Sequence, residues 1–235
     1  MAISGGPDIL TDGLQLHLDA ADENSYSGSG STWYDLAGNS RNGIIQGATY
    51  SSADNGSFIF NGSTSYIDCD SFVSTYDNFT NSTECFWFKC NNTTSGPGPL
   101  LYLGGLYRPL GNFSSYWSNE SITFYYYNNI EGAYTGGHDL FIDNIWHYAC
   151  WCFGPGFNKI YVDGIDLNLT YRYGSSTSTV PSSFYSSTTK FIIGRRTTDS
   201  YAFGGNISQV SIYDRALSAS EILQNYNATK GRFGL

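Results

Sequence analysis

Short segments in which apolar and polar residues alternate recur along this chain, and they restrict its fold more than any other feature. In residues 14–20, three leucines alternate with Gln15, His17 and Asp19. A period of two residues puts successive side chains on opposite faces, as in a strand with one buried face. Comparable segments, many of them rich in aromatic residues, follow at 42–46, 57–62, 65–69, 79–90, 100–105, 121–128, 144–153, 159–169, 189–196 and 205–215. The sequence therefore predicts a nearly all-β protein.

Turn signals add two hairpins to this prediction. Asp163-Gly164 is a dipeptide favoured in two-residue hairpin turns, so it predicts a hairpin over residues 159–169. A second hairpin is predicted over residues 58–69, with its turn at Gly62. No helical pattern separates successive strands, and the sheets are therefore expected to be antiparallel.

One helix is expected near the C-terminus, where Ser218 and Glu221 have the spacing of a capping box. The 235 residues suit a single domain, because all-β sandwiches of this size commonly fold as one unit. Residues 1–12 are interpreted as an extended arm and residues 13–235 as the sandwich.

Charge excludes two classes of partner. The chain has 11 Lys and Arg residues against 20 Asp and Glu residues, which gives a net charge of −9. A nucleic-acid-binding surface needs a basic face, and so does docking on anionic lipid. The sequence also contains no apolar run long enough to span a membrane and no secretion-type leader, so synthesis in the cytoplasm, or export without a cleaved leader, is expected.

The five cysteines are predicted to be buried thiols. Their odd number, without a leader, fits a disulfide framework poorly. Cys150 and Cys152 should share one strand face, but the paired-ligand spacing of a zinc site is missing. A disulfide between Cys85 and Cys90, or across strands, is the remaining alternative.

Two segments carry a resemblance to a known family. They are 13–69, with DAADENSYSGSGSTWYDLAGN, and 204–235, with YDRALSASEILQNYNATKGRFG. Both resemble the opening and closing segments of laminin G-like, concanavalin A-like domains, in the form found in virion structural proteins of tailed bacteriophages. The middle is similar through NIWHYACWCF followed by KIYVDG. The resemblance implies an antiparallel two-sheet jelly-roll sandwich with one short C-terminal helix.

The same superfamily contains glucanases, so catalysis must be considered. A retaining glycosidase needs two carboxyl groups about 5–5.5 Å apart. In those glucanases they alternate along one strand, whereas Glu84, Glu120 and Glu131 stand without acidic neighbours at such spacing. We therefore expect no catalytic residues and no enzyme activity.

Calcium is the one cofactor that the sequence offers as a candidate. Asp19, Asp22 and Asn24 form the best local cluster of oxygen ligands, and the alternative is a solvated acidic loop. Many laminin G-like domains carry an acidic residue near the closing strand. Here that stretch reads Ile207-Ser208-Gln209-Val210, which weakens the case for a family-type site.

The segment 115–137 is the candidate recognition surface. Trp117, Tyr125, Tyr127 and Tyr134 combine aromatic rings with neighbouring amides and hydroxyls, as sugar-binding sites do. The same residues suit a protein–protein contact, because Tyr and Trp are enriched at interfaces.

The resemblance and these residues together predict a non-catalytic virion structural protein, an exterior capsid decoration or cement protein or a fibre knob. Its expected partners are capsid, tail or fibre subunits and further copies of itself in a homo-oligomer, without nucleic acid or membrane insertion. The alternative is a lectin-like adhesin that binds a glycan on the host surface. A hydrolase of host glycans is disfavoured because the carboxylate pair is missing.

Overall fold

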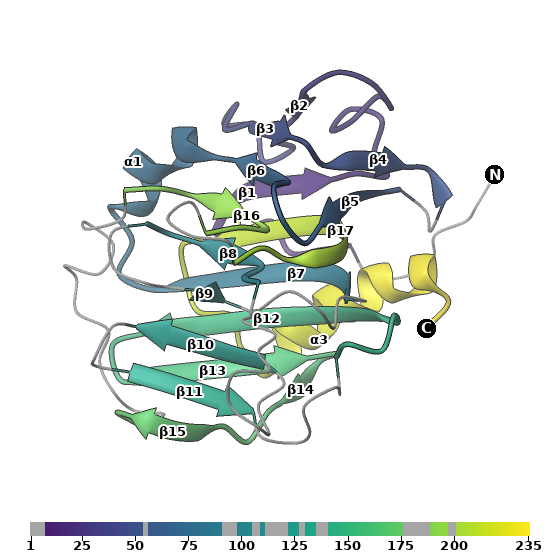
Figure 1. Cartoon of the computed structure of the whole chain (residues 1–235). Coiled ribbons are helices and arrows are strands. Elements are labelled where there is room, and N and C mark those ends of the chain that lie inside the picture. The colour runs from purple at the N-terminus through teal and green to yellow at the C-terminus, as the bar shows by residue number, and fades with distance from the viewer. Residues whose placement is uncertain are drawn as a thin grey trace.

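The computed structural model describes residues 8–53, 56–90, 98–104, 109–110, 122–126, 130–134, 141–175, 189–196 and 201–235. Two antiparallel sheets pack face to face, and the C-terminal helix lies behind the larger one (Figure 1). The predicted sandwich is therefore confirmed.

Within the described residues, the larger sheet has eight strands. Its path begins at one edge and runs β14 (Ile165–Asp166), β13 (Phe157–Val162), β12 (Trp146–Gly154), β7 (Ser82–Cys90), β17 (Gly204–Tyr213), β5 (Ser57–Asn61) and β4 (Thr49–Ser51). The eighth strand, β1 (Leu14–Asp19), also pairs with β17.

The second sheet has nine strands within the same residues. Its order is β15 (Thr170–Tyr173), β11 (Ile130–Tyr134), β10 (Ile122–Tyr126), β9 (Pro109–Leu110), β8 (Leu101–Tyr102), β16 (Ile192–Ile193), β6 (Tyr66–Asp68), β3 (Gly43–Gln46) and β2 (Thr32–Trp33). The predicted C-terminal helix is α3 (Ala219–Thr229). The described residues also form three shorter helical elements, η2 (Asp70–Phe72), α1 (Val73–Tyr76) and η3 (Lys230–Phe233).

Strand β17 changes partners part-way along one edge. Its first half pairs with β5, its second half pairs with β1, and β7 pairs along its other edge. The exchange falls at Ser208, where the register with β7 slips between Ile207 and Gln209. Ser208 Oγ donates to the Gly56 carbonyl at 2.7 Å, and the Ala20 amide donates to the Ser208 carbonyl at 2.9 Å. A bulge at this point lets one strand hold two neighbours end to end.

One predicted hairpin is confirmed and the other is wrong. Asp163 and Gly164 have φ of 53° and 80° and connect β13 to β14. By contrast, β5 and β6 belong to different sheets and do not pair. Asn61 Oδ1 accepts the amide hydrogens of Ser63 and Thr64 at 2.9 and 2.8 Å. This side-chain turn carries the chain across from one sheet to the other instead of closing a hairpin.

An aromatic core fills the space between the sheets. Trp33 packs on Phe58 with ring centroids 4.8 Å apart, and Trp151 stacks on Phe153 at 4.0 Å. Aromatic rings bury large apolar areas and dominate such cores. The high aromatic content of the sequence is therefore accounted for mainly by packing.

A second core lies between the larger sheet and α3. Trp87 stacks on Phe233 and Tyr226, with centroids 4.2 and 5.7 Å away, and its Nε1 donates to Thr229 Oγ1 at 2.7 Å. The helix begins where predicted, with Ser218 and Glu221 forming the capping box. Both faces of β7, β12 and β17 are consequently buried.

The described part of the arm packs on this helix. The Leu10 amide donates to Asn225 Oδ1 at 2.9 Å, and Tyr213 Oη donates to the Leu10 carbonyl at 3.0 Å. Residues 8–12 therefore lie against the C-terminal segment of the same chain.

All five cysteines are buried without a disulfide bond, as predicted. Cys85 and Cys150 face each other across β7 and β12, and the Cys150 thiol donates to Cys85 Sγ at 2.6 Å. Burial raises the pKa of Cys69 and Cys152 well above the ordinary thiol value. Such thiols are poor nucleophiles.

Candidate functional site

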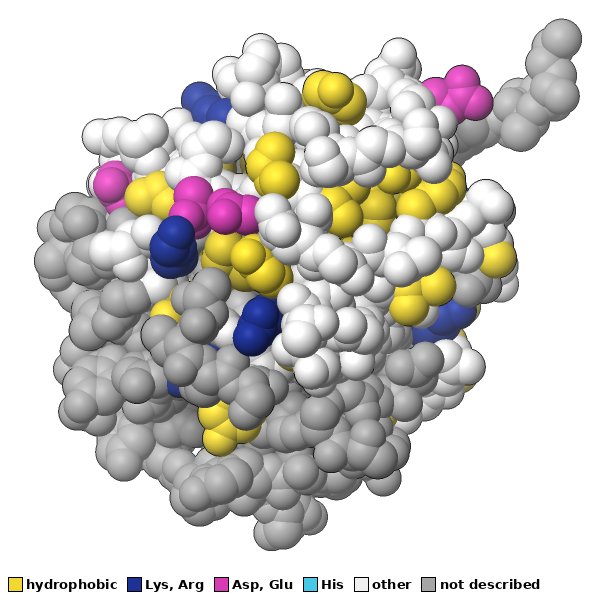
Figure 2. Space-filling view, turned by 45° about the horizontal axis from the view of Figure 1, so that its top comes forward, with side chains coloured by type: hydrophobic (Ala, Val, Ile, Leu, Met, Phe, Trp, Pro, Cys, Tyr) yellow, Lys and Arg dark blue, Asp and Glu magenta, His cyan; other side chains and the backbone are white. Residues whose placement is uncertain are grey.

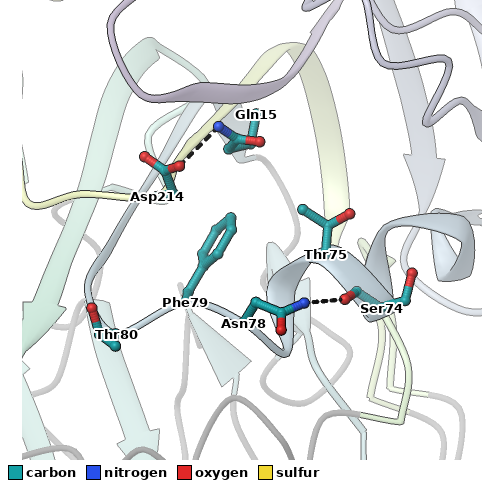
Figure 3. A pocket seen from close by; sticks show the side chains of 7 residues that line it. All are labelled: Gln15, Ser74, Thr75, Asn78, Phe79, Thr80 and Asp214. Atoms are coloured by element: carbon teal, nitrogen blue, oxygen red, sulfur yellow. Dashed lines mark hydrogen bonds between the residues drawn. The ribbon is translucent and has the colours of Figure 1, made fainter.

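A pocket of about 350 Å³ opens where three distant parts of the chain meet, and its volume falls in the range of small-molecule sites (Figure 3). We call it the Phe79 pocket. One wall comes from β1 and from the residue that follows β17, and the other comes from α1 and the link to β7. Its lining residues are Gln15, Ser74, Thr75, Asn78, Phe79, Thr80 and Asp214.

Hydrogen bonds fix the first wall. Gln15 Nε2 donates to Asp214 Oδ2 at 2.9 Å. One nitrogen of the Arg41 guanidinium donates to the Gln15 carbonyl at 2.8 Å and to its Oε1 at 3.3 Å. Arg41 thereby sets the orientation of the Gln15 amide. Asp214 Oδ1 lies beside Gly13 and receives no hydrogen bond from the described residues, so the carboxylate keeps acceptor capacity.

The opposite wall is held by the end of α1. Asn78 Nδ2 donates to the Ser74 carbonyl at 2.8 Å, and the Asn78 backbone amide donates to the Thr75 carbonyl at 3.1 Å. Among the described residues, these bonds use the backbone N–H of Asn78 and one of its two side-chain N–H groups, which leaves the second side-chain N–H as a donor and Oδ1 as an acceptor. The hydroxyls of Ser74 and Thr75 have no partner within the described part of the chain.

The floor of the pocket is apolar. Phe79 points into the pocket between its two walls (Figure 3) and is 7% exposed. Its ring packs against Tyr76 and Phe72, with centroids 5.1 and 6.0 Å away. An apolar floor within a rim of carboxylate, amide and hydroxyl groups can hold a small polar molecule that has one apolar face.

A buried carboxyl group lies below this floor. Tyr76 Oη donates to Glu84 Oε1 at 2.9 Å, and Glu84 is fully buried. Burial raises the pKa of Glu84 from 4.5 to about 8, because a charged carboxylate is poorly solvated inside the sandwich. Glu84 is therefore mostly neutral at pH 7 and adds no charge to the pocket.

The other polar cluster lies at the predicted calcium ligand Asp19. The guanidinium of Arg232 donates to Asp19 Oδ1 and Oδ2 at 2.7 and 2.6 Å. Gln209 Nε2 and the Ala21 amide also donate to this carboxylate, each at 2.9 Å. Burial alone would raise the pKa of Asp19, but the bonds and charge of Arg232 outweigh it and lower the pKa.

The three predicted calcium ligands have separate roles in the structure. Asp22 Oδ1 accepts the backbone and side-chain N–H groups of Asn24 at 2.8 and 2.9 Å, while Asp19 is bound by Arg232. Among the described residues, no group of three or more His, Cys, Asp and Glu side chains is arranged to hold a metal ion. Calcium here stays a prediction, and the ion would compete with Arg232 for Asp19.

The predicted aromatic surface lies largely outside the residues that the structure describes. Trp117 and Tyr127 lie outside the described residues. The backbone of Tyr125 lies opposite Glu131 in the β10–β11 pair, and that of Tyr134 lies opposite Ile122. The side chains of Tyr125 and Tyr134 also fall outside the described part.

Sequence reasoning missed the Phe79 pocket altogether. Its polar residues come from segments that are far apart, and Gln15 and Asp214 are separated by 199 positions. The only local signal was the position of Asp214 within the segment 204–235 that carries the family resemblance.

Among the described residues, no helix has both the length and the apolar character needed to cross a membrane.

Several solved structures have a fold similar to that of this chain. The domain 4 structure of a GH43 extracellular arabinanase from Geobacillus stearothermophilus, in complex with arabinotriose, aligns with a TM-score of 0.62 at 17% identity. That alignment covers 91% of this chain and 98% of the other. The receptor-binding domain of a botulinum neurotoxin C/D mosaic serotype gives 0.56 at 12% identity, over 92% and 51% of the two chains.

A sialidase from Trypanosoma rangeli, in complex with 2,3-difluorosialic acid, gives a TM-score of 0.62 at 17% identity. The alignment covers 94% of this chain and 34% of the sialidase, so the chain spans about a third of that protein's length. No curated protein sequence matches the chain.

These likenesses define the class as a lectin-like β-sandwich. The profile of the concanavalin A-like lectin/glucanases superfamily, in its Laminin_G_3 form, matches residues 60–223. The chain therefore belongs to the concanavalin A-like lectin/glucanase superfamily.

The buried carboxyl group makes a prediction about pH. A group whose pKa is raised on folding stabilises the fold fully below its unfolded pKa and loses that effect as pH rises through its folded pKa. For Glu84 the window runs from pH 4.5 to about 8. Stability should fall there by up to about 1.4 kcal/mol per pH unit, and Glu84→Gln should remove this decline.

Urea unfolding of both proteins from pH 5 to 9 measures the difference. Glu23→Gln, at an exposed glutamate, is the matched control and should retain the decline of the wild type. Parallel pH profiles for wild type and Glu84→Gln would show that the buried carboxyl group has no such effect.

The Asp19–Arg232 pair makes a prediction about stability. Arg232→Ala leaves the buried Asp19 carboxylate without its main partner, which should cost about 3 kcal/mol. Arg232→Lys keeps the charge but loses the two-pronged geometry, and it should cost less. Chemical denaturation at pH 7 measures both, and an unchanged midpoint for Arg232→Ala would contradict the assignment.

Proposed function

We propose that this chain is a non-catalytic carbohydrate-binding domain that holds a sugar in the Phe79 pocket. The observation that carries the proposal is the composition of the pocket, with an apolar floor inside a rim of fixed polar groups. The likeness to an arabinanase domain solved with arabinotriose supports it, because that domain and this chain match over nearly their full lengths.

The rim fits the hydrogen-bonding pattern of a sugar. Hydroxyl groups are both donors and acceptors. Asp214 Oδ1 and Asn78 Oδ1 are available as acceptors, while the Ser74 and Thr75 hydroxyls can take either role. Phe79, which is 7% exposed, contributes its ring edge to the apolar floor of the pocket.

The lining of the pocket supports binding without hydrolysis. Glycosidases flank the scissile bond with two carboxyl groups. Asp214 is the single carboxyl group among the seven lining residues. Glu84 lies beneath the floor and is hydrogen-bonded to Tyr76, so it has no access to a bound sugar.

Charged side chains are sparse among the described residues on one face of the molecule. The face in Figure 2 shows mostly uncharged polar side chains and backbone, with separate apolar patches and scattered Lys, Arg, Asp and Glu. Such a surface suits recognition through hydrogen bonds rather than through a strong electrostatic field.

Substitution in the pocket tests this proposal. Asp214→Ala removes a charged acceptor and should weaken sugar binding by about 10- to 100-fold, the usual value of a hydrogen bond to a charged group. A glycan array selects the ligand, and titration calorimetry measures its affinity. Asp166→Ala, at an exposed aspartate on β14, is the matched control and should bind as the wild type does.

An array without any bound glycan would count against the proposal. Equal affinities for Asp214→Ala and the wild type would place the sugar site elsewhere.

The virion structural role remains a second candidate, favoured by the segments 13–69 and 204–235. The proposed protein is an exterior capsid decoration or fibre-knob protein that contacts capsid, tail or fibre subunits and further copies of itself. If this is correct, antibody against the chain should label purified phage particles at a fixed copy number on head or tail. Intact particles that lack the chain would contradict the role.

A further inference from the structure

We infer that the Phe79 pocket selects uncharged sugars and rejects sugars that carry a carboxylate, such as sialic and uronic acids. This inference rests on the proposed function and names the ligand class of the same site. It starts from the charges in the pocket: among the described residues, Asp214 is the only acidic one that lines it, and no Lys, Arg or His does so.

Arg41 and Arg215, each next to a lining residue, are already bound within the protein. Arg41 donates to the carbonyl and side-chain oxygens of Gln15, and its guanidinium lies 5.6 Å from the centre of the Phe72 ring. Arg215, which follows Asp214, pairs with Glu221 at 2.8 Å and with Asp12 at 3.0 Å. Neither guanidinium lines the pocket as a counter-ion for a ligand carboxylate.

Arg41 also determines which atoms of the rim face a ligand. It donates to Gln15 Oε1, which turns Gln15 Nε2 towards Asp214. One of the two N–H groups of the Asn78 side chain is similarly used by the Ser74 carbonyl. Oxygen acceptors at Asp214 and Asn78 therefore remain, and they need donors from the ligand.

Sugar hydroxyls supply such donors, whereas a carboxylate is acceptor-only. A ligand carboxylate would place like charge against Asp214, and like charges juxtaposed at a binding site strongly oppose binding. The net charge of −9 adds a repulsion that salt screens.

Two of the similar structures were solved with different types of sugar. The arabinanase domain was solved with arabinotriose, a neutral sugar, and the sialidase with a derivative of sialic acid. The fold is shared with both, so fold alone does not choose between them. The lining of this pocket favours the neutral type.

The test compares neutral and anionic glycans on one array, followed by calorimetry with the best neutral ligand and with 3′-sialyllactose. The wild type should bind neutral oligosaccharides, and it should bind sialylated and uronate-containing ones at least about 100-fold more weakly. Raising the salt concentration should reduce this difference in affinity, because salt screens the repulsion between like charges.

Asp214→Asn distinguishes charge from hydrogen bonding, since it keeps an oxygen acceptor and removes the negative charge. The ratio of the affinities for neutral and anionic ligands should fall at least about tenfold in Asp214→Asn. It should stay unchanged in the remote control Asp166→Asn.

Sialylated or uronate glycans that bind the wild type as tightly as neutral glycans would overturn the inference while leaving sugar binding itself intact. An affinity ratio that stays unchanged in Asp214→Asn would also overturn it. Absence of binding to every glycan would instead refute the proposed function, and the ligand class with it.

Discussion

The pairing of β17 along both edges is the constraint on which the rest of the structure depends. One edge is bonded to β7, while the other is shared by β5 and β1 on either side of the bulge at Ser208. All ten residues of β17 are buried. The strand thus joins the beginning, middle and end of the chain in one sheet, and it sets where Asp214 leaves that sheet beside Gln15.

Burial of the larger sheet on both faces explains the composition of the chain. A sheet with one solvated face needs apolar residues only on alternate positions. Here β7 places Phe86 towards the sandwich core and Trp87 towards α3, so both sets of side chains are buried. The helix is therefore a third layer of the fold, and its continuation brings Arg232 to Asp19.

The contact between Arg232 and Asp19 joins the two segments that carried the family resemblance. The opening segment supplies Asp19 and the closing segment supplies Gln209 and Arg232, whose side chains both donate hydrogen bonds to the Asp19 carboxylate. The segments specify how the sandwich closes. The proposed sugar pocket uses Asp214 and Gln15 from the same closure, together with α1.

Some of the structure followed from local sequence because its cause is local. The strand period, the Asp163-Gly164 turn and the Ser218–Glu221 capping box each depend on neighbours a few residues away, and all three were predicted correctly. The hairpin at Gly62 was wrong because the hydrogen bonds of Asn61 favour a sheet-crossing turn, and alternation alone does not reveal which sheet a strand will join.

The sequence by itself determined that this chain forms antiparallel strands with one capped C-terminal helix, since periodicity and capping act over a few residues, and the family resemblance implied the two-sheet sandwich. Only the tertiary structure decided that the helix forms a third layer, that Asp19 is neutralised by Arg232 and that Gln15, Asn78 and Asp214 meet around Phe79. Gln15 and Asp214 are 199 positions apart, and Asp19 and Arg232 are 213 apart. Contacts at such separations depend on strand pairing across the whole sheet, because no local pattern encodes them.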